Sequence, residues 1–188
     1  MIIGITGTLG AGKGTVAEYL VDKKGFTHLS VREFLNKEIV RRGLAINRDN
    51  MVRVGNDLRK KYGQSYLAES LYEIARKSAK DCIIESLRAP GEIETLRKKG
   101  SFYLFAVDAE PKIRYKRVLL RQGETDRVSF EEFARNEKRE MESKDPNKQN
   151  LGKCILLADF KFDNNGIVED LYRKVDKALD EIEKDKKD

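Results

Sequence analysis

Tryptophan is absent from this 188-residue chain, and cysteine, proline and histidine are scarce, at two, three and one residues. No apolar run approaches the roughly 20 residues that cross a bilayer, so we expect no membrane partner. The N-terminal apolar run is short and lacks a basic leader, which argues against a signal peptide and favours a cytoplasmic location. Cys82 and Cys154 lack metal-ligand spacing and lie in apolar contexts, so we expect two buried thiols in a reducing compartment.

The charge of the chain is nearly balanced, with 38 Lys and Arg against 32 Asp and Glu and a formal net charge of +6. The basic residues are spread through the chain instead of being gathered in one arm. This pattern favours phosphate binding in a cleft, and nucleic-acid binding is the less favoured alternative. The length suits a single domain, residues 1–188, in a monomer or small homo-oligomer.

The first fifteen residues carry the most specific motif. An apolar run at residues 2–5 predicts a strand, a glycine-dense loop follows it, and a helical pattern comes next. Gly7, Gly12 and Lys13 have the G-x-x-x-x-G-K spacing of a phosphate loop, in which backbone N–H groups, a helix N-terminus and the lysine charge hold phosphates. The predicted nucleotide-binding residues of this loop are Gly7, Thr8, Gly10, Ala11, Gly12, Lys13, Gly14 and Thr15.

Downstream, strand patterns alternate with helical ones, which predicts a doubly wound α/β fold with a five-stranded parallel sheet. About fifty residues look wholly helical and predict a small helical lobe at about 31–78. Ile74 and Ile167 are expected on the buried faces of their helices. The expected strands are residues 2–5, 26–30, 81–86, 102–107 and 159–163. The expected helices are residues 12–24, 34–43, 47–62, 67–74, 89–99, 111–121, 129–141, 155–157 and 167–182.

Residues 10–15, GAGKGT, resemble the G-x-G-K-G-T loop of adenylate kinases, and residues 28–35 resemble the segment that opens their acceptor lobe. Residues 158–166 are similar to the closing strand and turn of dephospho-coenzyme A kinases. The chain therefore resembles the superfamily of P-loop nucleoside-monophosphate kinases and dephospho-coenzyme A kinases. It is most similar to an uncharacterised archaeal kinase-like family, on residues 41–43, 58–63, 85–90 and 139–140. The resemblance implies an ATP-dependent phosphotransferase that uses Mg²⁺.

The resemblance assigns roles to particular side chains. It implies that Glu85, at the end of the third predicted strand, holds Mg²⁺-bound water or takes the acceptor's proton, although related kinases mostly have Asp there. Arg88 is similar to the arginine that grips the acceptor's phosphate, which a guanidinium binds bidentately. Thr15 has two open roles, contact with Mg²⁺ or with the α-phosphate, because Gly14 stands where Ser or Thr is usual.

The resemblance also implies that the helical lobe at about 31–78 binds the acceptor and that a basic, polar stretch at about 117–145 forms a lid. The other implied contacts belong to these two segments. Arg117 and Arg121 share one helix face and resemble lid arginines that close over the triphosphate, and Arg127 is a further candidate. His28 is expected to pack at a strand end without a catalytic role. The predicted catalytic residues are Lys13, Glu85, Arg88 and Arg121, and the metal-binding ones are Thr15 and Glu85. The predicted acceptor-binding residues are Ser30, Glu33, Arg41, Arg42, Arg59 and Arg88.

Two acceptors stay open: a (deoxy)nucleoside monophosphate, which we favour because the acceptor-lobe segment determines acceptor identity, and the ribose 3′-hydroxyl of dephospho-coenzyme A. Asn36 stands where adenylate kinases usually have arginine, which weakens the case for AMP. A GTP switch is rejected because residues 147–150, NKQN, lack the Asp of the guanine-reading N-K-x-D motif. The alternative of another class is an ATP-hydrolysing nucleic-acid-binding or regulatory protein, which usually has a second acid where Ser86 stands.

Overall fold

The computed structural model describes residues 1–121 and 128–185 of the chain. Within these ranges, five parallel strands form one sheet in the order β2-β3-β1-β4-β5. The strands are β1 (Ile2–Gly7), β2 (Thr27–Ser30), β3 (Cys82–Glu85), β4 (Phe102–Asp108) and β5 (Phe160–Asp163). Helices lie between each strand and the next, because parallel neighbours need crossover connections. The predicted doubly wound α/β fold with a five-stranded parallel sheet is confirmed.

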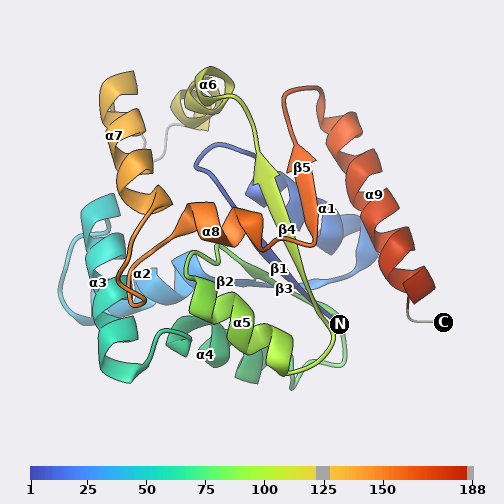
Figure 1. Ribbon diagram of the computed structural model, residues 1–188, viewed down its shortest axis with the longest axis horizontal. Coiled ribbons are helices and arrows are strands. Elements are labelled where there is room, and N and C mark those ends of the chain that lie inside the picture. Colours follow the sequence, from blue (N-terminus) through green and yellow to red (C-terminus); the bar gives the residue numbers. More distant parts are fainter. Residues whose placement is uncertain (122–127, 186–188) are drawn as a thin grey trace.

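Helices cover both faces of this sheet (Figure 1). The helices are α1 (Lys13–Lys24), α2 (Val31–Arg41), α3 (Arg48–Tyr62), α4 (Tyr66–Ala75), α5 (Pro90–Lys98), α6 (Pro111–Arg121), α7 (Phe130–Met141), α8 (Leu151–Leu156) and α9 (Val168–Asp185). Helices α1 and α9 pack against one face, around Ile3 and Ile5. The second core, around Ile84 and Leu104, is formed with residues of α2, α3, α4, α5 and α8.

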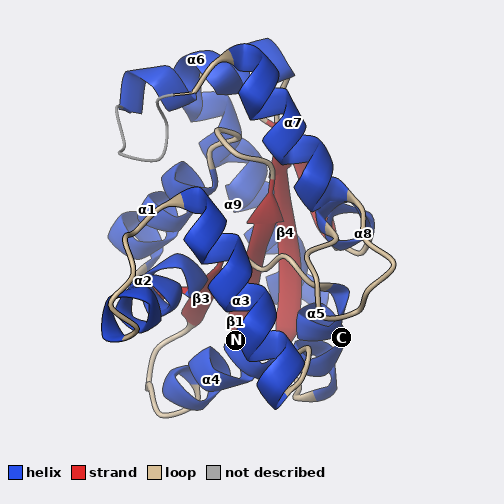
Figure 2. Ribbon diagram, turned by 90° about the vertical axis from the view of Figure 1, so that its left-hand side faces the viewer, coloured by secondary structure: helices blue, strands red, loops and turns tan. Residues whose placement is uncertain are grey.

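The two segments predicted as lobe and lid lie on different sides of the sheet's carboxyl edge. Residues 31–78 form α2, α3 and α4, and the lid segment contains the end of α6 and all of α7. Figure 1 shows α6 beyond the arrowhead of β4, and Figure 2 shows α6 and α7 together at one end of the molecule. In open α/β sheets ligands bind at this carboxyl edge, so the lobe and the lid flank the expected place of the site.

Several predicted helix ends are confirmed by their caps. Gly25 follows α1 in the left-handed region (φ 74°), and its N–H donates to the carbonyls of Leu20 and Val21. The side chain of Asn47 accepts from the N–H of Asn50 at 2.8 Å and starts α3. In these segments the local sequence determines where the helix begins or ends.

Two burial predictions are wrong. Ile74 is 52% exposed, because the buried stripe of α4 runs through residues 67, 68, 71 and 75 and leaves position 74 beside it. Ile167 is 64% exposed, because it precedes the first residue of α9 and so lies outside the apolar stripe of that helix. Both cysteines are buried, as predicted. Among the described residues, no helix combines the length and apolarity that a membrane span requires.

Candidate active site

The loop between β1 and α1 is shaped by glycines that leave no room for a side chain. Gly7 (φ +135°) ends β1, and a Cβ there would lie 2.0 Å from the carbonyl oxygen of Val107. Gly12 (φ +106°) is the N-cap of α1, and a Cβ there would lie 2.4 Å from Nδ2 of Asn164. The backbone therefore turns tightly into the N-terminus of α1, whose N–H groups and dipole favour a bound anion.

Lys13 is folded back into this loop. Its side chain is buried, and Nζ donates to the carbonyl oxygens of Gly7 at 2.9 Å and Thr8 at 2.8 Å. Burial, helped by the nearby charge of Arg88, lowers the pKa of Lys13 from 10.5 to about 7. A phosphate in the loop would favour the charged ammonium, so Lys13 is suited to binding an anion at the end of β1.

Two elements far along the chain hold the loop in place. The hydroxyl of Thr8 donates to Oδ1 of Asp108, at the end of β4, over 2.5 Å. Nδ2 of Asn164, which follows β5, donates to the carbonyl oxygen of Ala11 over 2.7 Å. These hydrogen bonds hold the loop on the side that faces away from the cleft. Three predicted loop residues therefore do not line the cleft: Gly7, Thr8 and Ala11.

The cleft in front of the loop has a volume of about 620 Å³ and gathers most of the predicted site. The predicted residues that line it are Gly10, Gly12, Lys13, Gly14, Thr15, Ser30, Glu33, Glu85, Arg88, Arg117 and Arg121. They come from the phosphate loop and the start of α1, from the end of β2 and the start of α2, from the end of β3 and the segment after it, and from α6. One cavity therefore joins the predicted donor, acceptor and lid residues. Arg127 lies outside the described residues.

Glu85 lies at the end of β3 with both carboxylate oxygens engaged. Oε2 is 3.2 Å from Nε2 of His28, and Oε1 accepts from the hydroxyl of Ser86 over 3.2 Å. Burial alone would raise the pKa of Glu85, but the hydrogen bond with His28 and the charge of Lys13 outweigh it and hold the pKa below its ordinary value. Ser86 has a left-handed backbone (φ 73°), which L residues rarely adopt and which is often found at functional sites. Glu85 is thus a fixed, ionised carboxylate in the cleft.

His28 lies at a strand end, as predicted, but its ring also lines the cleft and contacts Glu85. The hydrogen bond with Glu85 raises the pKa of His28 above 6.5. The contribution of this pair to stability is therefore present below pH 6.5 and lost as the pH rises through the raised pKa of His28.

The single histidine makes this contact directly testable. In an NMR titration of the ring protons, we expect His28 to titrate above pH 6.5 in the parent protein and at a clearly lower pH in Glu85→Gln, because burial of the ring then lowers its pKa without the opposing carboxylate. Glu94→Gln, which removes an exposed carboxylate from α5, is the control and should leave the midpoint unchanged. An unchanged midpoint in Glu85→Gln would show that the contact does not form in solution.

Arg88 connects the cleft to a second, smaller cavity of about 50 Å³, which it also lines. Its Nη1 donates to Oε2 of Glu140 on α7 and lies 3.5 Å from Oε1 of Gln149. Its backbone N–H donates to Oε2 of Glu92 at 2.9 Å. Arg88 therefore lies at the junction of β3, the lobe and α7, between the two cavities.

Three arginines predicted to bind the acceptor lie outside the cleft. Arg41 is on the outer end of α2, is 74% exposed and pairs with Glu38 at 2.7 Å. Arg42 pairs with Glu38 as well, and neither arginine lines the cleft or the smaller cavity. Arg59 is fully buried and lines only the smaller cavity. We therefore leave Arg41 and Arg42 out of the site.

Several cleft residues were not predicted from the sequence. Arg32 lines both cavities, and Glu18 lines the larger one. Arg48 and Glu140 line the smaller one and form an ion pair of 2.7 Å between α3 and α7. The position of Arg32, two residues after the predicted Ser30, was a usable signal, but nothing local connects Arg48 with Glu140.

The cleft suits a magnesium ion that is held mainly by nucleotide phosphates. The Thr15 hydroxyl and the Glu85 carboxylate, both oxygen ligands that Mg²⁺ accepts, line the same cavity. Across the described ranges, no group of three or more His, Cys, Asp or Glu side chains could hold a metal. A metal with few protein ligands and several phosphate or water oxygens is the usual form of magnesium in phosphoryl-transfer sites.

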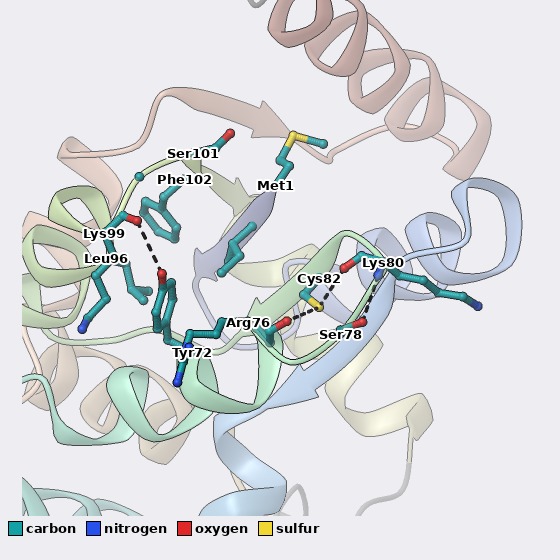
Figure 3. Close-up of a pocket in the computed structure, with 13 residues that line it drawn as sticks. Met1, Tyr72, Arg76, Ser78, Lys80, Cys82, Leu96, Lys99, Ser101 and Phe102 are labelled. Carbon is teal, nitrogen blue, oxygen red and sulfur yellow. Dashed lines mark hydrogen bonds between the residues drawn. The ribbon is translucent and has the colours of Figure 1, made fainter.

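A third cavity lies at the opposite edge of the sheet, at the amino ends of β1, β3 and β4, and has a volume of about 220 Å³. Figure 3 shows Tyr72, Leu96 and Phe102 around it, with the thiol of Cys82 close by. The hydroxyl of Tyr72 donates to the carbonyl oxygen of Lys99 over 3.4 Å. This edge is remote from the phosphate loop, so the cavity is no part of the candidate active site.

Comparisons with known proteins identify the family. A family model described as an AAA domain matches residues 3–145. UPF0200 protein MJ1399 of Methanocaldococcus jannaschii is 30% identical over 185 residues, which cover 97% of this chain and 90% of that protein. The chain belongs to the UPF0200 family. A second member, UPF0200 protein TK1334 of Thermococcus kodakarensis, is 28% identical over 97% of this chain and 98% of its own length. The predicted relation to an archaeal kinase-like family is confirmed.

Solved structures with the same fold include kinases. TT1252 from Thermus thermophilus superposes with a TM-score of 0.61 and 22% identity, over 96% of this chain and 97% of that one. Shikimate kinase from Bacteroides thetaiotaomicron gives a TM-score of 0.58 and 13% identity, over 96% and 98%. At these identities the comparison establishes the fold alone. The UPF0200 chain therefore has a P-loop kinase-like fold.

Proposed function

We propose that this UPF0200 protein is an ATP-dependent phosphotransferase that moves the γ-phosphoryl group to a small phosphorylated acceptor of the (deoxy)nucleoside-monophosphate type. The observation that carries the proposal is the single cleft that joins Lys13 of the phosphate loop, Glu85 of β3 and Arg88 beside the lobe. Arg117 and Arg121 of α6 enter the same cleft. The donor and acceptor phosphates would thus lie in the same cleft, with cationic side chains of the protein on both sides of them.

Phosphoryl transfer needs positioning and charge neutralisation more than covalent chemistry. The loop N–H groups and Lys13 would bind the β- and γ-phosphates, and Arg88 would hold the acceptor opposite them. Arg117 and Arg121 would close over the triphosphate and exclude water. A magnesium ion on Thr15 and Glu85 would supply further neutralisation of the phosphate oxygens.

The surroundings of Glu85 favour a phosphate over a hydroxyl as the attacking group. A phosphate monoester, with a second pKa near 6, is largely ionised at neutral pH and needs no base. A hydroxyl needs a base, and the hydrogen bond with His28 and the charge of Lys13 hold the pKa of Glu85 below its ordinary value, which makes its carboxylate a weak base. Glu85 is therefore better suited to orienting metal-bound water than to taking a proton.

The resemblance of residues 158–166 to dephospho-coenzyme A kinases does not bear on the acceptor. Asn164 in this segment donates to the carbonyl of Ala11 and so supports the donor loop. The smaller cavity, where we place the acceptor's phosphate, is lined mainly by other segments, from α2, α3 and α7. Dephospho-coenzyme A remains the second candidate acceptor, and no observation at the cavity favours it over a nucleotide.

An acceptor screen tests the function. ADP release from MgATP is measured with each ribo- and deoxynucleoside monophosphate and with dephospho-coenzyme A, beside a Lys13→Ala control. We expect at least one monophosphate to raise ADP release well above the rate without acceptor. If no acceptor does so, the proposal fails, and ATP hydrolysis stimulated by nucleic acid would support the alternative class.

A further inference from the structure

The smaller cavity is unusually rich in arginine. Arg32, Arg48, Arg59 and Arg88 all line it, and Glu140 is the one carboxylate among its described lining residues. The cavity shares Arg32, Ser86 and Arg88 with the nucleotide cleft, so the two spaces adjoin. Its volume of about 50 Å³ is enough for a few water molecules but not for a nucleotide.

Glu140 fills the centre of this arginine cluster from α7. Oε1 lies 2.7 Å from Nη2 of Arg48, and Oε2 accepts from Nη1 of Arg88. The Glu140 side chain is 4% exposed. Burial alone would raise the pKa of Glu140, but Arg88 and Arg48 outweigh it and hold the pKa below its ordinary value. The carboxylate therefore stays ionised and bridges two arginines, as an oxyanion of a bound ligand would.

Glu140 does not use all the donors of the cluster. Within the described part of the chain, Nη1 of Arg59 and Nε of Arg48 are buried without a hydrogen-bond partner. Arg59 itself is only 1% exposed, and its Nε and Nη2 both donate to Oε1 of Glu92. A buried donor without a partner costs free energy, so a ligand that supplies more acceptor oxygens than one carboxylate is favoured.

The local charge indicates which ligand that is. Three of the four arginines, Arg48, Arg59 and Arg88, pair with Glu92 or Glu140, so this group carries three positive and two negative charges. If Glu140 leaves, two positive charges remain without a partner. A phosphate monoester is close to a dianion at neutral pH and brings three acceptor oxygens. It would therefore neutralise these two positive charges better than a single carboxylate does.

We propose that Glu140 occupies the place of the acceptor's phosphate group and is displaced by it, so that Glu140 of α7 is a specificity-determining residue for dianionic acceptors. This inference rests on the proposed function. Displacement breaks the contacts of α7 with α3, including the 3.0 Å pair of Arg139 with Asp49, and opens the cavity to the rest of the acceptor. In Figure 1, α7 lies directly above α3, where such an opening would begin.

The test uses inorganic phosphate as the probe and needs no phosphotransfer. Lys13→Ala is the background, which weakens phosphate binding in the loop. Phosphate affinity is measured by ³¹P NMR and by thermal shift at constant ionic strength. Adding Glu140→Gln should tighten phosphate binding about tenfold or more, because close buried charge pairs are commonly worth that much. The affinity for acetate, a monoanion, should increase by a smaller factor.

The matched control is Glu142→Gln, which removes an exposed carboxylate two residues further on. Arg88→Gln added to Glu140→Gln should abolish the gain. Equal phosphate affinity in the Glu140→Gln and Glu142→Gln proteins would overturn the proposal. Because the acceptor screen is independent, a failed screen with the expected phosphate binding would refute the kinase and leave the anion site standing.

Glu140→Gln also leaves two arginines without their partner, so it is expected to lower the melting temperature in chloride. Phosphate should then restore that temperature more than it raises that of the background protein. Glu140→Asp, one methylene shorter, cannot bridge both arginines equally and should give a smaller gain in phosphate affinity. Loss of stability that phosphate does not reverse, in either variant, would make Glu140 a structural ion-pair partner only and overturn the proposal.

Discussion

Replacing Lys13 with alanine is expected to lower kcat for phosphotransfer roughly 10²- to 10³-fold, the usual effect of removing one donor that stabilises a developing oxyanion. Lys13 is the ammonium at the end of β1, within the loop that would hold the triphosphate. Steady-state ADP release with the acceptor found in the screen measures the effect. Lys23→Ala, at an exposed position of the same helix, is the control and should leave kcat unchanged.

The Lys13→Ala protein should remain folded, since a buried ammonium with a depressed pKa does not stabilise the fold. Between about pH 7 and 10.5 the unfolded chain binds the Lys13 proton and the folded chain does not. Stability of the parent protein without nucleotide should therefore rise with pH across this window more than that of Lys13→Ala. If kcat falls only because the variant unfolds, the assignment of Lys13 to the donor phosphates is wrong.

The second large effect concerns stability. Glu92→Ala is expected to lower the free energy of unfolding by about 3–5 kcal/mol, the range for breaking a buried ion pair. Glu92 has no exposed surface, and Oε1 accepts from Arg59 at 2.9 and 2.7 Å. Its Oε2 accepts from the N–H groups of Arg88 at 2.9 Å and Ala89 at 3.0 Å. Urea denaturation followed by circular dichroism gives the change.

Glu94→Ala is the control for this measurement, because Glu94 is exposed on the same helix. A surface change of this kind is usually worth within about 0.5 kcal/mol. Equal stability of the Glu92→Ala and Glu94→Ala proteins would mean that the Arg59–Glu92 pair is replaceable by water. In that case the hydrogen bond from the backbone of Arg88 to Glu92 would hold Arg88 less firmly in place.

The sheet and the donor loop were predictable because their signals are local. The strand, the glycines and Lys13 follow one another within fifteen residues, and glycine or Asn caps mark the ends of α1 and α3. The two errors in burial, Ile74 and Ile167, come from positions at the edge of a helix, where one residue decides which face a side chain joins. The hydrophobic periodicity alone does not determine which face of the helix such a residue joins.

The acceptor side depends on contacts between distant segments. Arg88 and Glu140 are 52 positions apart, and His28 and Glu85 are 57 apart. In the sequence, Glu140 is one acid among several on a highly charged helix, and the adjacent pair Arg41–Arg42 attracts more notice than Arg48. Only the tertiary structure distinguishes the arginines that gather around a cavity from those that pair on a helix surface.

The two hydrogen bonds that brace the phosphate loop have a consequence for folding. Thr8 and Asp108 are 100 positions apart in the sequence, and Ala11 and Asn164 are 153 positions apart. Contacts of such sequence separation form late, because the long intervening chain must first be closed. The loop precedes both of its partners in the sequence, yet it is fixed only after they have folded. Nucleotide binding would therefore report that β5 has joined the sheet.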